Sequence, residues 1–356
     1  MNPADNIKPE VRGLRAYSLR PDRARVKLNQ NENPWDVPPE IMNETLRRIG
    51  AHKLSRYPDF SPLSLQKQLA RFSGWLPEGI IAGNGSNELI QASLMVTVDA
   101  NTPVLISEPT FALYRQIVTV LGGEVISAPL TSELNYDVEA IRKTIKERQP
   151  RLTIICSPNN PTGCVIDRTD LISLLELSSG LVVIDEAYHE FSGESAVPLL
   201  ESHSNLIVLR TFSKAMAMAG LRVGYLLAAP ELTKETRKAV LPYNLNLISQ
   251  VAAEVAIEMY DSVLKPRVEE ICRERERVYS KLGLIEGLSP VPSRANFIAV
   301  RSAIEPRRVY EELLDKGILI RDISGYPMMR DYFRVSVGTA DENDELIAAL
   351  TEIFSA

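Results

Sequence analysis

The sequence is short of the residues that mark disulfide-rich and metal-binding proteins. It has only three cysteines and three histidines among 356 residues. Cys156, Cys164 and Cys272 form no CxxC pair, and their odd number gives no complete disulfide framework. The histidines do not stand at the spacing of metal ligands. We therefore expect a reduced protein that holds no metal ion.

Long apolar runs and an excess of positive charge are absent as well. No stretch approaches the roughly 18 consecutive apolar residues of a membrane helix, and the N-terminus, MNPADNIKPE, lacks the apolar run of a secretory signal. The net charge is −6 and the pI is near 5.4, whereas a nucleic-acid surface needs clustered Lys and Arg. We expect a cytoplasmic protein that binds neither membranes nor nucleic acids.

The composition is that of a globular protein, with 45% hydrophobic and 24% charged residues. A chain of 356 residues exceeds what one compact core normally holds. From about residue 80 to 230, unbroken apolar runs alternate with helical stretches, which is typical of a mostly parallel α/β sheet covered on both faces. The runs are PVLIS (103–107), EVIS (124–127), LTIIC (152–156), LVVI (181–184), LIVL (206–209) and VGYLL (223–227).

The C-terminal part shows a different order of elements. Val268, Ile271, Val278 and Leu282 recur at helical spacing, which predicts a long solvated helix with one buried stripe. Strand-like and helical stretches follow it at 296–300 (strand), 309–317 (helix), 318–322 (strand), 333–338 (strand) and in a terminal helix through Phe354. We expect a large domain over 46–258, a small α+β domain over 259–356, and an N-terminal segment, 1–45, that packs with the small domain.

Three motifs follow directly after predicted strands. SPNNPTG (157–163), DEAY (185–188) and TFSKAMAMAGLRVG (211–224) each come after one of the apolar runs. Taken singly, they are compatible with a turn, a helix N-cap and a solvated lysine. Open α/β sheets, however, bind ligands at the carboxyl ends of their strands. Asn160, Asp185 and Lys214 are therefore expected to converge there.

Two further features favour a cofactor site. Lys214 is flanked by Ala, Met and Gly, with no other charge until Arg222, and an apolar setting lowers the pKa of a lysine, as a Schiff-base lysine requires. GNGSNE (83–88) leads into an apolar stretch, and glycines before a helix start offer free backbone amides to an anion. A cofactor with a phosphate, an acidic phenol oxygen, a ring nitrogen and an aldehyde would use all of these groups.

On these motifs the chain resembles fold-type I pyridoxal-phosphate enzymes of the class I/II aminotransferase group, and within it the histidinol-phosphate aminotransferases. The DEAY, SK and GLRVG set is highly specific for the superfamily, and the resemblance covers essentially the whole chain. The subgroup likeness rests on LNQNENPW (28–35), RYPD (56–59), GNGSNE, EPTF (108–111), SPNNPTG, VIDEAY (183–188), TFSKAMAMAGLRVG, LIRD (319–322) and FRVSVGT (333–339).

The resemblance implies a role for each residue around a pyridoxal 5'-phosphate ring. Lys214 would bind the cofactor as a Schiff base and then carry a proton between Cα of the substrate and C4′ of the cofactor. Asp185 would pair with the protonated ring nitrogen. Asn160 and Tyr188 would hydrogen-bond the phenolate oxygen. Phe111, where many relatives carry tyrosine, would stack on the ring.

The resemblance also implies a phosphate site and a shared active site. The phosphate would be bound by Ser86, Asn87, Thr211, Ser213 and Arg222, and the arginine adds a charge-assisted pair. Tyr57 would reach the phosphate of the cofactor in a neighbouring subunit. A homodimer with both active sites at its interface is therefore expected.

Two arginines are the expected residues for binding the substrate. Arg334 matches the arginine that binds the distal anion of the substrate in the family, and Arg321 is its expected companion. Histidinol phosphate has no carboxylate, so a two-arginine site would take its phosphate. Tyr17 and Asn33 are weaker candidates for covering the substrate.

The first hypothesis is transamination between histidinol phosphate and 2-oxoglutarate, a step of histidine biosynthesis. An aminotransferase for aromatic or other amino acids and a threonine-phosphate decarboxylase stay open, because no residue named above decides which Cα bond breaks. A regulator built on this fold would add a DNA-binding domain upstream, and we do not expect one. A structural homologue without activity is not expected either, because every type of cofactor contact is present.

Overall fold

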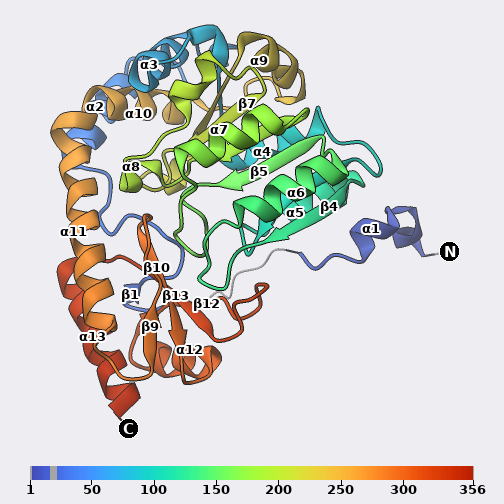
Figure 1. The fold of residues 1–356 in the computed structure, drawn as a ribbon. Helices are drawn as coiled ribbons and strands as arrows, with labels where there is room; N and C mark the ends of the chain where they lie inside the picture. Colours follow the sequence, from blue (N-terminus) through green and yellow to red (C-terminus); the bar gives the residue numbers. More distant parts are fainter. Residues whose placement is uncertain (1, 17–21, 356) are drawn as a thin grey trace.

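A seven-stranded sheet forms the centre of the larger of two units (Figure 1). The structure, a computed structural model, describes residues 2–16 and 22–355. The strand order is β2-β8-β7-β6-β5-β3-β4, and all neighbouring pairs are parallel except the two that β8 makes. The predicted fold class, a mostly parallel α/β sheet, is confirmed. The strands are β2 (Ile80–Asn84), β3 (Pro103–Glu108), β4 (Glu124–Pro129), β5 (Leu152–Cys156), β6 (Leu181–Asp185), β7 (Leu206–Thr211) and β8 (Val223–Ala228).

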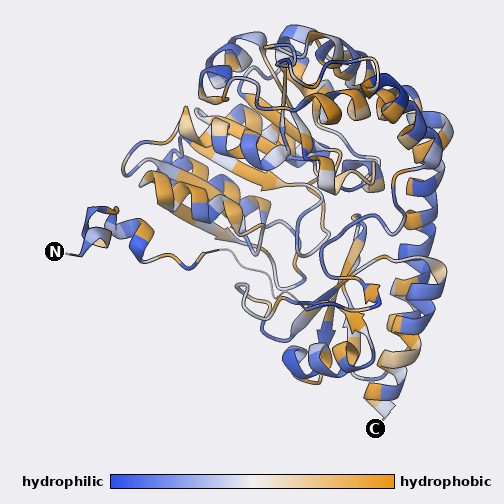
Figure 2. Cartoon of the chain, turned by 180° about the vertical axis from the view of Figure 1, so that it is seen from behind, coloured by the Kyte–Doolittle hydropathy of each residue, from blue (hydrophilic) through white to orange (hydrophobic). Residues whose placement is uncertain are grey.

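Helices cover both faces of this sheet, which explains why its strands are apolar without interruption. In β3, Val104 and Ile106 join the core under α4 and α5, and Leu105 joins the core on the opposite face under α6 and α7. Figure 2 shows hydrophobic strands between helices whose outer sides are hydrophilic. The helices are α3 (Leu63–Ser73), α4 (Ser86–Met95), α5 (Leu113–Leu121), α6 (Val138–Arg148), α7 (Arg168–Leu177), α8 (His189–Ser192), α9 (Pro230–Thr236) and α10 (Leu247–Glu258).

All six predicted strands of the large unit are present, and one further strand was missed. The missed strand, β2, pairs antiparallel with β8 at the sheet edge. In the part of the chain that the structure describes, no helix has the length and apolar character needed to cross a membrane.

The smaller unit is built from the C-terminal part of the chain. The predicted long helix, α11 (Lys265–Leu282), runs along both units (Figure 1) and buries Val268, Ile271, Val278 and Leu282 as expected. A four-stranded sheet in the order β12-β13-β10-β9 packs against it and against α13. The remaining elements are β9 (Leu288–Pro290), β10 (Phe297–Ser302), α12 (Pro306–Asp315), β12 (Arg321–Asp322), β13 (Tyr332–Ser336) and α13 (Ala340–Ser355).

The prediction of one strand over 318–322 is wrong. β11 (Ile318–Leu319) pairs in parallel with β1 (Val26–Lys27), whereas β12 pairs antiparallel with β13. The chain leaves one sheet and enters another at Ile320, which is buried. Arg321 is thereby brought into register with Arg334.

The N-terminal segment does not pack as one piece. Val26 and Leu28 are buried in the core of the small unit. In contrast, α1 (Pro9–Arg12) lies beside α5, where Lys8 Nζ donates to the Val120 carbonyl at 3.3 Å. The predicted boundary at residue 45 falls inside α2 (Pro39–Ile49), which packs against α10 of the large unit. The division into 1–45, 46–258 and 259–356 stays a prediction. Short helical turns complete the fold at Pro3–Asn6, Pro77–Gly79, Val197–Glu201, Ala219–Leu221, Arg237–Ala239 and Tyr260–Leu264.

Candidate active site

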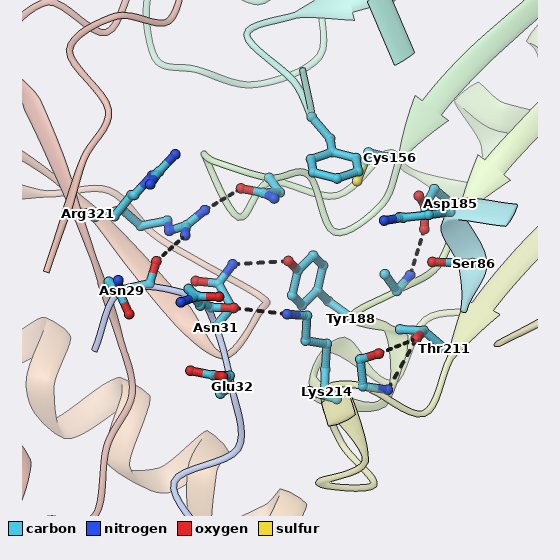
Figure 3. A pocket seen from close by; sticks show the side chains of 18 of the residues that line it. Asn29, Asn31, Glu32, Ser86, Cys156, Asp185, Tyr188, Thr211, Lys214 and Arg321 are labelled. Carbon is cyan, nitrogen blue, oxygen red and sulfur yellow. Dashed lines mark hydrogen bonds between the residues drawn. The ribbon is translucent and has the colours of Figure 1, made fainter. Parts of the chain in front are cut away.

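A cavity of about 440 Å³ lies where the carboxyl ends of β5, β6 and β7 face the small unit. This volume is within the range of small-molecule sites. The segment 29–32 closes one side of the cavity (Figure 3). The sequence-predicted residues that line the cavity are Ser86, Asn87, Phe111, Asn160, Asp185, Tyr188, Thr211, Ser213, Lys214, Arg222, Arg321 and Arg334.

Lys214 follows β7 and directs its amine into the cavity (Figure 3). Its Nζ donates to the Gln30 carbonyl at 2.9 Å. Burial, followed by the nearby positive charge of Arg334, lowers the pKa of Lys214 to about 8. The lowered pKa increases the neutral fraction near neutral pH, and the neutral amine is the form that acts as a nucleophile and as a general base.

Asp185 is the last residue of β6 and is buried, with 3% of its surface exposed. Its Oδ1 accepts from the Ala187 backbone N–H at 3.0 Å, and its Oδ2 accepts from the Tyr114 hydroxyl at 2.7 Å. Burial raises the pKa of Asp185 to about 6, and both hydrogen bonds oppose that rise. The group is therefore a carboxylate at neutral pH, and a cationic N–H in the cavity would be a suitable partner.

Tyr188 is buried, and its hydroxyl accepts from Asn31 Nδ2 at 3.0 Å. Because the amide supplies this hydrogen, the phenolic proton of Tyr188 stays available for an acceptor in the cavity. Asn31 is itself fixed from the small unit. Its backbone N–H donates to Ser336 Oγ at 2.8 Å, and its carbonyl accepts from Asn296 Nδ2 at 3.0 Å. Tyr188 is thus tied to the small unit through one asparagine.

Two adjacent asparagines in the turn 157–163 have different roles. Asn159 is fully buried and donates to the Pro109 carbonyl at 2.9 Å, while its own Oδ1 accepts from Thr110. Asn160 lines the cavity, and its Oδ1 accepts from Arg334 Nη1. The first asparagine holds the turn, which leaves the second to face a ligand.

The start of α4 forms one wall of an anion site. The first N–H groups of a helix have no partner within the helix, and they carry a partial positive charge. Gly85 precedes the helix with φ +79°, a left-handed backbone that favours glycine. A Cβ on Gly224 of β8 would collide with the Ser86 backbone nitrogen. Two glycines thus allow the strand and the helix start to approach closely.

Hydroxyl groups and a guanidinium form the other wall of the anion site. Thr211 Oγ1 lies 3.0 Å from Ser213 Oγ, and Arg222 Nη1 donates to Ser213 Oγ at 3.3 Å. These donors fit a phosphate group, which accepts several hydrogen bonds and pairs with arginine.

Arg321 and Arg334 stand directly opposite each other on β12 and β13. Opposed residues of an antiparallel pair project from the same face of the sheet, so the two guanidinium groups serve one end of the cavity. Arg334 is buried, and its Nη2 donates to the Asn29 carbonyl at 3.0 Å. Tyr326 also lines the cavity. This end is suited to a substrate anion.

Two predicted residues, Asn33 and Tyr57, do not line this cavity. The Nδ2 of Asn33 donates to the carbonyls of Lys214 and Ala215 at 3.3 and 3.1 Å, so it holds the lysine loop, and its role in covering the substrate stays a prediction. Tyr57 is 81% exposed and stacks on Tyr243 with the ring centroids 4.6 Å apart. Tyr17 lies outside the described residues.

Several cavity residues were missed by sequence reasoning. Gln30, Asn31 and Glu32 line the cavity and belong to the LNQNENPW motif, whereas Asn33 is the only residue of that motif predicted as a site residue. Tyr114 lies three residues after Phe111, and its ring meets that phenylalanine edge-on at 5.6 Å. An aromatic residue one helical turn from a predicted site residue was the available signal.

Comparison with known proteins assigns the class that this fold and site define. The family described as Aminotransferase class I and II matches residues 23–350, and the chain belongs to this family. The fold is that of the family, and the lysine, carboxylate and amide lie at adjacent strand ends.

Several similar proteins share a more specific name. The chain is 38% identical over 348 residues to the histidinol-phosphate aminotransferase of Thermoanaerobacter pseudethanolicus, which covers 98% of each chain. It is 38% identical over 354 residues to histidinol-phosphate aminotransferase 1 of Carboxydothermus hydrogenoformans, covering 99% of this chain and 100% of the relative. The crystal structure of the Sinorhizobium meliloti histidinol-phosphate aminotransferase in complex with pyridoxal-5'-phosphate covers 98% of each chain, with a TM-score of 0.88 and 26% identity.

Proposed function

We propose that the protein transfers an amino group between histidinol phosphate and 2-oxoglutarate with pyridoxal phosphate as cofactor, as a cytoplasmic enzyme of histidine biosynthesis. One observation carries the proposal. The cavity has Lys214, Asp185 and Asn160 around its centre, an anion site at α4, and a second cationic end at Arg321 and Arg334. Two anion sites in one cavity suit a phosphorylated cofactor together with a phosphorylated substrate. The names of the full-length relatives agree with this substrate.

The residues of the cavity fit pyridoxal phosphate group by group. The start of α4, with Ser213 and Arg222, would hold its phosphate, and Asp185 would accept from its ring N–H. Tyr188 and Asn160 would donate to its phenolic oxygen, with the Asn160 amide nitrogen as donor. When bound, the cofactor supplies an aldehyde that joins an amine and a ring that accepts the electron pair of Cα.

This chain's own residues do the remaining work. Lys214, with its lowered pKa, takes the proton from Cα of the substrate and returns it to the amine-bearing carbon of the cofactor. Asp185 would accept a hydrogen bond from the ring nitrogen and favour its protonated form. Phe111, half-buried at the cavity wall, covers one face of the ring. The segment 29–32 shields the reacting atoms from water.

A homodimer follows from the same proposal. Tyr57 would complete the anion site of a second copy, and it lies in an exposed apolar surface. Tyr57 (81% exposed) and Phe60 (67%) both pack against the ring of Tyr243 (40%), and these three aromatic side chains form the surface. Contiguous exposed apolar groups mark interaction sites. Sedimentation equilibrium should give twice the chain mass of 39.6 kDa, and a monomer at assay concentration would reject shared active sites.

Arg321→Ala is expected to raise the KM for histidinol phosphate by roughly 10- to 100-fold, because charge-assisted hydrogen bonds to the substrate phosphate are lost. The kcat should change less, since the contact lies away from the reacting atoms. The KM for unphosphorylated histidinol should not change. Arg301→Ala is the matched control, because Arg301 is on β10 of the same sheet, beyond β13, and its side chain is 63% exposed. Equal effects on both substrates would remove Arg321 from the phosphate site.

The function itself is tested by a half-reaction. The purified protein is mixed with pyridoxal phosphate, and its absorbance is followed as histidinol phosphate is added without an oxo acid. Conversion of the cofactor to its pyridoxamine form supports the proposal. Carbon dioxide release from threonine phosphate, or conversion by aromatic amino acids alone, would replace it with one of the other activities.

A further inference from the structure

Tyr114 lies behind the cavity and touches two residues of the proposed cofactor site. It is on the first turn of α5, and none of its surface is exposed. Its hydroxyl donates to Asp185 Oδ2 at 2.7 Å, and its ring meets the Phe111 ring at 5.6 Å and 86°. One side chain therefore contacts both the carboxylate assigned to the ring nitrogen and the aromatic ring assigned to the ring face.

The hydrogen bond is suited to holding a charge. The two oxygens of Asp185 each accept one hydrogen bond, from Ala187 N–H and from Tyr114, and both bonds favour the ionised carboxyl. Burial itself is unfavourable to the charged form of Asp185, and Tyr114 belongs to an apolar core cluster that includes Ile106, Val118 and Ile154. A buried carboxylate without sufficient donors takes up a proton.

We propose that Tyr114 is a positioning residue that keeps Asp185 ionised and oriented for a cationic ring nitrogen and that supports Phe111 from behind. This inference rests on the proposed function of the cavity. A protonated Asp185 could not pair with a ring N–H cation, so the hydroxyl of Tyr114 would govern how tightly the ring nitrogen is held. The pKa of Asp185, about 6, already reflects burial opposed by this bond. Titratable groups on the neighbouring elements interact electrostatically with Asp185. They are Tyr114 from α5, Cys156 from β5, Tyr136 before α6, and Glu186 and Tyr188 after β6.

The test compares two variants that each lose one buried hydroxyl. Tyr114→Phe removes the donor to Asp185 and keeps the ring beside Phe111. Tyr136→Phe is the control, because the Tyr136 hydroxyl is also buried but donates to the Cys156 carbonyl. In cofactor-free protein, infrared titration of the carboxyl band should show the pKa of Asp185 raised by about one pH unit in Tyr114→Phe, and unchanged in Tyr136→Phe.

Binding of pyridoxal phosphate, measured by quenching of protein fluorescence, should be about tenfold weaker in Tyr114→Phe. In the Asp185→Asn background the same substitution should weaken binding no further, because Tyr114 would act through the carboxylate. An unchanged pKa of Asp185, or an equal loss of binding in that background, would overturn the inference. The infrared titration needs no catalysis, so the inference and the proposed function can fail separately.

Discussion

Lys214→Ala should lower the rate of transamination by at least about 10⁴-fold, because the substitution removes both the covalent attachment point and the general base. Lys214 Nζ occupies the cavity at 2.9 Å from the Gln30 carbonyl, and its lowered pKa of about 8 makes it the amine prepared for both tasks. The measurement is the single-turnover rate with histidinol phosphate, together with the absorbance band of the lysine-bound cofactor, which should disappear.

Lys146→Ala is the matched control for this experiment. Lys146 is exposed on α6, and its loss should leave both the rate and the band unchanged. A Lys214→Ala protein that keeps the band would show that another lysine binds the cofactor.

Asp185→Asn should lower the same rate by between about 10² and 10⁴-fold, because breaking one side of a buried charge pair costs about 3–5 kcal/mol. Asparagine keeps the size and can still accept from Tyr114, so the variant removes mainly the negative charge. Asp315→Asn, at an exposed position at the end of α12, is the control.

The Asp185 assignment also has a pH signature. The pKa of Asp185 is raised to about 6, so its carboxyl is charged above this pH and neutral below it. The affinity of the cofactor-free protein for pyridoxal phosphate should therefore fall as the pH drops through about 6. This fall should be larger than the fall in affinity that the Asp185→Asn variant shows over the same pH range. If the two pH profiles coincide, Asp185 does not pair with the ring.

The convergence of the site could be predicted from the sequence because its main groups are tied to strand ends. Asn160, Asp185 and Lys214 each follow a strand that its apolar run marks clearly, and parallel strands end at one edge of a sheet. The pairing of Arg321 with Arg334 came from the resemblance. The structure gives it a physical basis in their register on β12 and β13.

The contacts that the sequence did not reveal join residues far apart in the chain. Asn31 and Tyr188 are 157 positions apart, and Tyr114 and Asp185 are 71 apart. Local periodicity carries no information on such pairs. For the same reason the sequence indicated Asn33 as a residue that covers the substrate, whereas Asn31, two positions earlier, hydrogen-bonds the cavity residue Tyr188. The apolar pattern of 318–322 likewise did not show that β11 pairs with β1 in one sheet while β12 pairs with β13 in another.

The most direct test of the central claim is to identify the lysine that carries the cofactor. The protein is loaded with pyridoxal phosphate, reduced with borohydride, digested and mapped by mass spectrometry. We expect one stable modification, on Lys214, and its loss when histidinol phosphate is added before reduction. Modification of a different lysine, or a label on Lys214 that histidinol phosphate leaves in place, would contradict it.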